Sequence, residues 1–168
     1  MIVRFKTLVM SMLVLVVSAC SAKRVDAPVS TQDAIQVLVP DAIRLWSDYD
    51  DMRGTRQHRA IDIKAKKGAR ILAAKAGVVK ARGRHKTAGK WLEIQHDGGL
   101  VTRYLHLNGF AKRPGQQVRG GQCIGRVGDT GNARNVGPHL HFEWVHKRQK
   151  QDPMPHLRRL ARLKPGKR

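Results

Sequence analysis

Two histidines separated by one residue are the first feature of the sequence that could do chemistry. His139 and His141 flank Leu140 in the segment HLHFEWV. Side chains alternate between the two faces of a β-strand, so a strand here would place both imidazoles on one surface and large apolar residues on the other. A His-x-His pair is a weak signal by itself. It becomes a metal site only if further ligands lie nearby.

A second set of candidate ligands lies in the segment HRAID. His58 and Asp62 are four positions apart, and either a helix or the start of a strand could place both on one side. An imidazole and a carboxylate are donors suited to zinc. Two histidines and one carboxylate are a ligand set of catalytic zinc hydrolases, whereas structural zinc sites usually have four protein ligands and are rich in cysteine. His106, in the segment YLHL, follows the same strand alternation and is a further candidate for a polar cleft.

The residues from Ala60 onward must position these side chains, and their pattern predicts an all-β domain. Short β-like runs are separated by glycine-containing turns, and the runs are AIDI, ARILAAKAGVV, WLEIQHD, LVTRYLHL, QQVRGGQCIGRVG and HLHFEWV. Such strands at close spacing are typical of an antiparallel sheet, sandwich or barrel with little helix. Residues 32–49 predict either a short helix or two extended pieces, because Pro40 interrupts their apolar positions.

The motifs of this region resemble those of the M23 family of peptidases, the LytM and lysostaphin type. The resemblance covers residues 53–145, in the order that the family shows, and rests on HRAID, QHDGGLVTRYLHL, GQQVRGGQCIGRVGDTG and above all GPHLHFE at 137–143. It implies a compact β-fold with a substrate groove. One departure is Ala60, where the family usually has Gly. A side chain there would strain the backbone if the position required a positive φ.

The resemblance also implies zinc-dependent hydrolysis of peptide bonds. It assigns one Zn²⁺ and two catalytic imidazoles to five residues, namely His58, Asp62 and His141 as ligands and His106 and His139 as catalytic groups. A metal-bound water would attack the peptide carbonyl, and the two imidazoles would orient or deprotonate it and stabilise the tetrahedral intermediate. The resemblance leaves open which of the two imidazoles is the general base. For an exported member of the family, the implied substrate is the peptide crosslinks of bacterial peptidoglycan.

Other polar residues near these motifs carry weaker expectations. His96, in QHDGG, matches a family position near a turn, and we expect it to stabilise that turn. Glu143 would share the face of the His-x-His pair, where it could hydrogen-bond a ligand imidazole. Cys123 has apolar neighbours and predicts a buried structural thiol. The remaining histidines are interpreted as ordinary surface residues, and they are His85, His146 and His156.

The first twenty residues have the pattern of an export signal. Arg4 and Lys6 precede an apolar run that is shorter than a membrane-spanning helix needs. The run ends in Val17-Ser18-Ala19-Cys20, which resembles the lipobox of bacterial lipoproteins, where the cysteine is acylated and the chain is cut before it. We therefore expect residues 1–19 to be a signal peptide and Cys20 to carry a lipid anchor, with an ordinary cleavable signal as the alternative.

The charge balance indicates an anionic partner. The sequence has 33 Lys and Arg residues against 12 Asp and Glu, a net charge of +21, which suits nucleic acid, a lipid surface or an acidic polymer. Export argues against nucleic acid, and no zinc-finger, RNP or helix-turn-helix pattern stands out. Peptidoglycan is an anionic polymer that fits an exported protein. Ser21 after the candidate lipid anchor indicates the outer membrane, facing the periplasm, by resemblance to lipoprotein sorting.

Four segments follow from these patterns: a signal peptide at 1–19, a lipid-anchored tether and N-terminal extension at 20–52, an M23-like domain at 53–145 and a basic tail at 146–168. Pro155 could start a short helix in the tail, which would bind anionic wall or lipid headgroups or simply be solvated. Two other functions stay open. One is a non-catalytic activator of a cell-wall amidase, although such proteins typically lose zinc ligands that are all present here. The other is a secreted metalloprotease that acts on protein.

Overall fold

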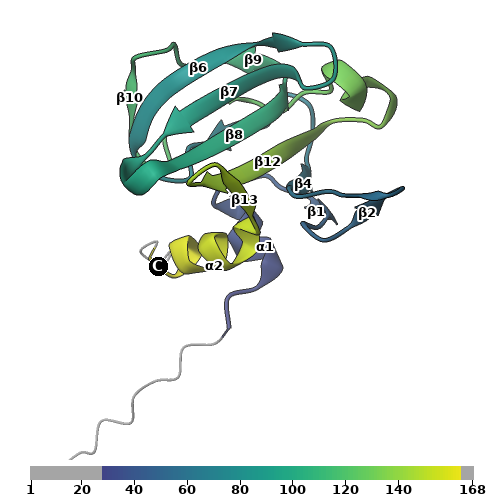
Figure 1. Ribbon diagram of the computed structural model, residues 1–168, viewed down its shortest axis with the longest axis horizontal. Helices are drawn as coiled ribbons and strands as arrows, with labels where there is room; N and C mark the ends of the chain where they lie inside the picture. The colour runs from purple at the N-terminus through teal and green to yellow at the C-terminus, as the bar shows by residue number, and fades with distance from the viewer. Residues whose placement is uncertain (1–27, 164–168) are drawn as a thin grey trace, which may run out of the picture.

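A large antiparallel sheet dominates the computed structural model, which describes residues 28–163 (Figure 1). In spatial order its strands are β1 (Arg44–Ser47), β4 (Ile61–Lys64), β12 (His139–His146), β8 (Leu100–Leu107), β7 (Gly89–Gln95), β6 (Gly77–His85) and β10 (Gln117–Val118), and β13 (Gln149–Gln151) pairs with β12. All of these pairings are antiparallel. The expected all-β class is therefore confirmed.

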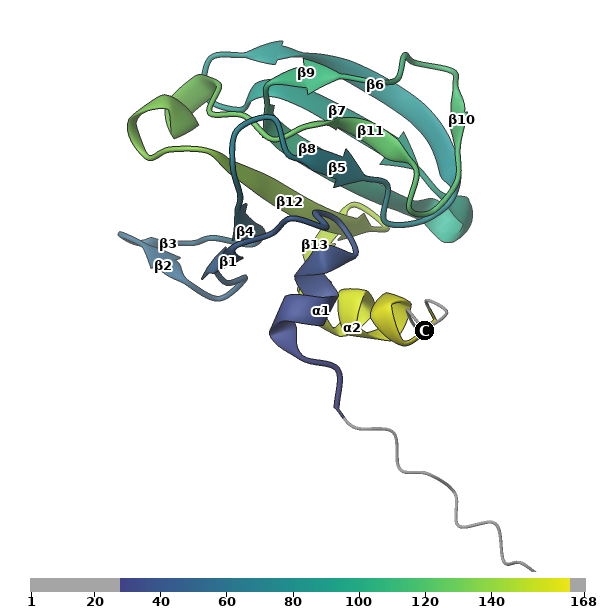
Figure 2. The ribbon, with the colours of Figure 1, turned by 180° about the vertical axis from the view of Figure 1, so that it is seen from behind.

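A smaller sheet lies against one face of the large one, as Figure 2 shows. It consists of β5 (Arg70–Leu72), β11 (Cys123–Arg126) and β9 (Gly109–Phe110). Leu92 and Tyr104 of the large sheet share a single buried cluster with Ile71 and Ile124 of the small one. Because the core occupies this face, the polar residues that alternate with the core residues lie on the opposite face.

Two short helices pack beside each other at one edge of the sheet (Figures 1 and 2). They are α1 (Thr31–Gln36) and α2 (Pro153–Leu163). The Ser30 hydroxyl caps α1 by accepting a hydrogen bond from the Asp33 N–H at 3.0 Å. The segment that predicted a helix or extended pieces thus contains both, since β1 follows α1. Neither helix of the described part of the chain is long and apolar enough to span a membrane.

Residues 146–168 were expected to form a basic tail outside the domain, but the described part of this segment, through residue 163, packs on the domain. Residues 149–151 form β13 on β12, and Leu157 of α2 is fully buried in the main core. The ring of His156 stacks on Trp144 with centroids 4.4 Å apart, so His156 is not an ordinary surface residue. The helical spacing of Leu157 and Leu160 gives α2 an apolar side that packs on the domain. The folded unit therefore extends through residue 163.

Four further short elements complete the fold. Strands β2 (Met52–Arg53) and β3 (Arg56–Gln57) form a small hairpin that projects beside β1 and β4 (Figure 1). Of two 3₁₀ turns, η1 (Asp97–Gly99) connects β7 to β8 within the large sheet, and η2 (Gly131–Asn135) leads from β11 of the small sheet to β12 of the large one. The expected signal peptide and Cys20 lie outside the described residues.

Candidate metal centre and catalytic groups

Asp62 and His141 are brought together by strand pairing. They are direct partners in the antiparallel ladder between β4 and β12, and direct partners in a ladder point to the same face of the sheet. Asp62 Oδ1 lies 2.8 Å from His141 Nδ1. On β12, Leu140 and Phe142 are fully buried, so their packing turns His141 to the face opposite the core.

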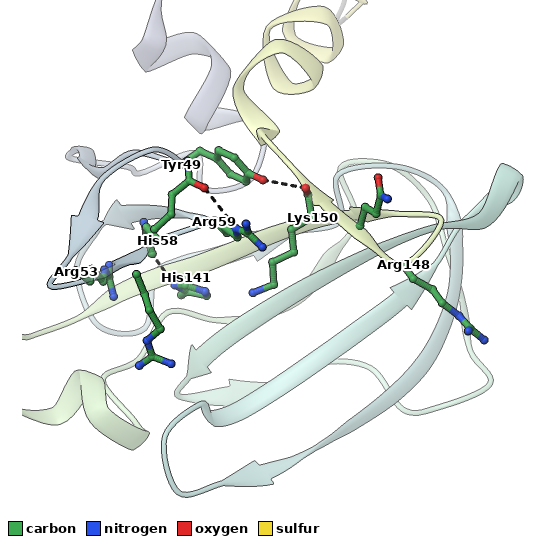
Figure 3. A pocket seen from close by; sticks show the side chains of 10 residues that line it. Tyr49, Arg53, His58, Arg59, His141, Arg148 and Lys150 are labelled. Atoms are coloured by element: carbon green, nitrogen blue, oxygen red, sulfur yellow. Dashed lines mark hydrogen bonds between the residues drawn. The ribbon is translucent and has the colours of Figure 1, made fainter.

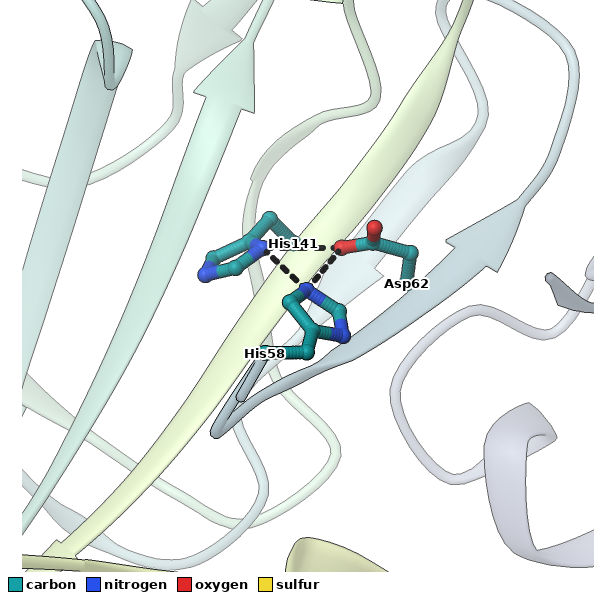
Figure 4. Close-up of side chains that lie close together, drawn as sticks. All are labelled: His58, Asp62 and His141. Atoms are coloured by element: carbon teal, nitrogen blue, oxygen red, sulfur yellow. Dashed lines mark hydrogen bonds and ion pairs between the residues drawn. The ribbon is translucent and has the colours of Figure 1, made fainter. Parts of the chain in front are cut away.

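His58 completes a group of three ligand atoms from the loop between β3 and β4 (Figure 4). Its Nε2 lies 3.3 Å from Asp62 Oδ1 and 3.2 Å from His141 Nδ1. Bonds of about 2.0–2.1 Å to a tetrahedral zinc ion place ligand atoms roughly 3.3 Å apart. The three separations are close to that value, and a nitrogen, nitrogen and oxygen set suits zinc. The group thus fits a zinc ion with a position left for solvent or substrate.

Both imidazoles of this group have a hydrogen-bond acceptor at the nitrogen that faces away from the centre. His58 Nδ1 lies 2.9 Å from the carbonyl oxygen of Asp48, and His141 Nε2 lies 3.4 Å from Glu143 Oε1. When these nitrogens donate, the other nitrogen of each ring turns its lone pair to the centre, which is the arrangement that ligand histidines usually show. Glu143 therefore lies where a hydrogen bond to a ligand imidazole was expected.

The charges of the group favour an ionised carboxylate. Burial opposes ionisation, but the close contacts of Asp62 with the His141 and His58 imidazoles outweigh it and hold the pKa of Asp62 well below its usual range. Burial likewise opposes ionisation of Glu143, yet His141 and Lys150 lower its pKa to about 2. Arg53 forms an ion pair with the second oxygen of Asp62. These carboxylates supply the negative charge that a divalent cation needs.

His106 and His139 lie beside the three ligand atoms. The centroid of the His106 ring is 4.8 Å from that of His139 and 5.8 Å from that of His141. His106 Nδ1 donates to the carbonyl of Thr130 at 2.9 Å, and His139 Nδ1 donates to the carbonyl of Gly137 at 2.8 Å. Each ring therefore keeps Nε2 as a proton acceptor. Burial lowers the pKa of both, to about 4 for His106, so both are neutral near pH 7.

A β-bulge gives His106 its direction. Simple alternation along β8 would place it on the face of Tyr104, which is fully buried in the core. Instead, Leu105 and His106 together stand opposite the single residue Trp91 of β7. His106 has a φ of 64°, and this combination turns its ring to the face that carries His139. The strand alternation expected for His106 does not hold at this point.

The positive φ in HRAID belongs to Arg59, at 54°, and not to Ala60. The Ala60 side chain is fully buried, and its backbone has a conformation that any L-residue adopts, so alanine in place of glycine causes no left-handed strain.

His96 lies outside the cluster. Its Nδ1 donates to Ala76 O at 2.7 Å, and its Nε2 lies 2.8 Å from Thr102 Oγ1, which ties together the ends of two strands. Cys123 was expected to be a buried thiol, but the structure shows it only half-buried.

A cleft of about 790 Å³ opens beside His58 and His141 (Figure 3). The β2–β3 hairpin and the following residues form one wall, and β13 forms the other. Several residues around it were not identified from the sequence, among them Arg53, which pairs with Asp62, and Lys150, whose Nζ lies 2.5 Å from Glu143 Oε1. No local pattern marks these residues, because only the folding of the hairpin and of β13 brings them to the site.

The chain is similar to known proteins in sequence and in fold. Residues 56–153 match the model of peptidase family M23. The chain is 43% identical over 88 residues to the DD-carboxypeptidase/endopeptidase Mpg of Neisseria meningitidis, covering 52% of this chain and 20% of that protein. It is 35% identical over 129 residues to an L-Ala--D-Glu endopeptidase of Bacillus subtilis, covering 67% and 38%. A crystal structure of a zinc-containing peptidase from Vibrio cholerae superposes with a TM-score of 0.61 at 32% identity, covering 66% of this chain and 36% of that one. The chain thus spans well under half the length of these relatives.

Proposed function

This chain belongs to peptidase family M23, and we propose that it is a zinc-dependent endopeptidase that hydrolyses peptide crosslinks in bacterial peptidoglycan. The observation that carries the proposal is the convergence of His58, Asp62 and His141 within 3.3 Å of one another, with two further imidazoles beside them. The Neisseria and Bacillus relatives are both named as endopeptidases, which supports the reaction class.

The three ligand residues would hold one Zn²⁺, which supplies Lewis acidity to polarise a peptide carbonyl and lowers the pKa of water. His106 and His139 present Nε2 to the same space, because the carbonyls of Thr130 and Gly137 hold their Nδ1 protons. A neutral imidazole in that orientation accepts a proton from the attacking water. The imidazolium so formed returns the proton to the leaving amine and stabilises negative charge on the carbonyl oxygen.

Catalysis accounts for this arrangement better than a purely binding role does. A protein that only activates an amidase needs a groove but has no need for three ligand residues and two buried, neutral imidazoles. All five side chains are at most partly exposed and are oriented by hydrogen bonds. Such orientation is typical of groups that handle protons and metal ions.

The decisive experiment measures zinc content and release of soluble peptide fragments from purified cell walls by the residues after Cys20. We expect about one zinc ion per chain, fragment release that stops with a chelator and returns with Zn²⁺, and little digestion of casein. Casein digestion without wall digestion would favour a general protease. Stoichiometric zinc without any hydrolysis of walls or peptides would contradict the enzyme.

We also propose that the protein is exported and anchored by lipid at Cys20, in the outer membrane facing the periplasm. The charged start, the apolar run and the Val-Ser-Ala-Cys sequence support this location. Replacement of Cys20 by Ala should release the protein from the membrane fraction, because acylation needs the thiol. Cys123→Ala is the matched control and should stay with the membrane. Equal membrane retention of the two variants after a high-salt wash would contradict the anchor.

A further inference from the structure

The cleft beside the metal centre is lined by positive side chains. They are Arg53, Arg56, Arg59, Arg148 and Lys150, and among the described residues none that lines the cleft is acidic. Arg53 and Lys150 have carboxylate partners in Asp62 and Glu143. Within residues 28–163, the other three guanidinium groups have no carboxylate within 4.0 Å. The cleft therefore concentrates uncompensated positive charge next to the reacting groups.

Hydrogen bonds fix both walls of this cleft. The Tyr49 hydroxyl donates to the carbonyl oxygen of Lys150 at 2.8 Å, and the Arg59 N–H donates to the carbonyl oxygen of Tyr49 at 2.9 Å. Figure 3 shows both bonds, with Arg59 and Lys150 near His141 and Arg148 at the far edge. The wall that carries Arg59 is thus tied to the wall that carries Lys150. These bonds tie the backbones of the two walls together, and the exposed cationic side chains project from them into the cleft.

Backbone conformation gives independent support. Among the described residues, four other than glycine have a positive φ: Arg59, His106, Lys147 and Arg148. His106 is a proposed catalytic residue, and Arg59 and Arg148 line the cleft. Lys147 and Arg148 form the two-residue turn between β12 and β13, where both positions require a positive φ and Asn-Gly is favoured. Strained conformations of this kind cluster at active sites and ligand clamps. The backbone of this turn does not require a positively charged side chain. We therefore attribute the presence of Lys147 and Arg148 to a function of their charge.

The positive surface continues along β13. A neighbouring cleft of about 460 Å³ shares Arg148 and Lys150 and adds Lys80 and Lys147. The two clefts together lead from the metal centre past the β12–β13 turn. An extended anionic chain could follow this path with several contacts, whereas a flat membrane surface could not enter the concave part that includes His58 and His141.

We propose that this cleft binds free carboxylates of the peptide on one side of the scissile bond, so that the enzyme prefers carboxylate-bearing peptides to amidated ones. The guanidinium fork matches a carboxylate in a bidentate fashion. Because His58 and His141 line the same cleft, its occupant lies next to the bond that is cut. This inference rests on the proposed hydrolysis of wall peptides and adds the chemical feature by which the substrate is selected.

The test compares two soluble peptides of identical sequence, one with free side-chain and terminal carboxylates and one with primary amides. For the wild-type protein we expect a KM roughly tenfold lower for the carboxylate peptide, with similar kcat, because two or three exposed charge contacts contribute about this much together. Arg56→Gln and Arg59→Gln should each narrow the ratio of the two KM values by about two- to fivefold, and 0.5 M salt should narrow it further. Arg59→Lys should retain part of the preference, since it keeps the charge without the fork.

Arg119→Gln is the matched control, because Arg119 is an exposed arginine directly after β10, at the other end of the sheet. It should leave the KM ratio unchanged, and every variant should hold the wild-type amount of zinc. Equal KM values for the two peptides in the wild type would overturn the carboxylate site and leave the proposed hydrolysis intact.

Hydrolysis of neither peptide would count against the proposed function, and calorimetric binding of the two peptides would then decide the site by itself. Equal affinity for the two peptides would overturn it. Binding to vesicles of anionic phosphatidylglycerol that Arg56→Gln and Arg59→Gln abolish, without any change in peptide preference, would also overturn it in favour of a lipid surface.

Discussion

Asp62 and His141 face each other across the β4–β12 ladder, with the carboxylate oxygen Oδ1 2.8 Å from the ring nitrogen Nδ1. Strand β12 lies inside the large sheet, so backbone hydrogen bonds on both sides set this distance. His58 enters from a loop, and the carbonyl of Asp48 fixes its ring. The sheet therefore provides two ligands at a nearly fixed separation, which is a preorganised site for a metal ion.

We expect His141→Ala and Asp62→Ala to lose the metal and all measurable hydrolysis. Three protein ligands leave little redundancy, so removal of one weakens binding of the ion by much more than loss of a surface contact would. Zinc content after dialysis and release of wall fragments check this expectation. His146→Ala, which changes a histidine at the β12 end away from the cluster, should keep both. Retention of stoichiometric zinc by His141→Ala would show that the ligand set is assigned wrongly.

For His106→Ala and His139→Ala we expect near-normal zinc content and a fall in kcat/KM of about 100-fold or more, the usual size of a lost acid–base group. Neither ring supplies one of the three candidate ligand atoms, but both rings lie beside those atoms. Metal analysis and hydrolysis of a soluble peptide, measured on the same samples, separate the two effects. Loss of zinc together with activity would instead identify the altered residue as a ligand.

The sequence predicted the residues of this site better than it predicted how they are positioned. The period of two in His-x-His was sufficient to predict that His139 and His141 share one face, because β12 is a regular strand with a buried apolar face. The same rule fails at His106, since a bulge depends on the partner strand and leaves no local pattern. The carbonyls of Thr130 and Gly137, which set the tautomers of His106 and His139, cannot be recognised from residue type at all.

The fold, like the site, was predicted from the sequence only in part. Glycine-marked short strands predicted the antiparallel class, whereas the C-terminal helix was expected to lie outside the domain because it is short and basic. Its apolar side is narrow in sequence, yet α2 packs against α1 and β12. The contact with α1 joins residues more than a hundred positions apart. Such a long-range contact overrides the low intrinsic stability of a short helix.

The buried position of α2 predicts that Leu157→Ala destabilises the domain by about 2–5 kcal/mol, as truncation of a fully buried leucine usually does. Arg158→Ala, one residue further on the exposed side of the same helix, should change stability by no more than about 0.5 kcal/mol. Urea denaturation of the metal-free proteins measures both. Equal effects of the two changes would mean that α2 does not pack on the core in solution.

His96 predicts a loss of stability in mild acid. It is 4% exposed, and burial lowers its pKa below the value of about 6.5 for an unfolded chain. As the pH falls through 6.5, the unfolded chain therefore takes up more protons at this position than the folded domain does. The stabilisation is present above pH 6.5 and is lost below it, with a slope of at most about 1.4 kcal/mol per pH unit.

His96→Gln should accordingly be less stable than the wild type at pH 7.5 and show a shallower decline down to pH 5.5. Urea denaturation across this pH range should use metal-free protein, because protons compete with a metal ion for its ligands and would add a second dependence on pH. The other buried histidines titrate equally in both proteins and cancel in the comparison. Parallel stability curves for wild type and His96→Gln would show that His96 does not resist protonation in the folded domain.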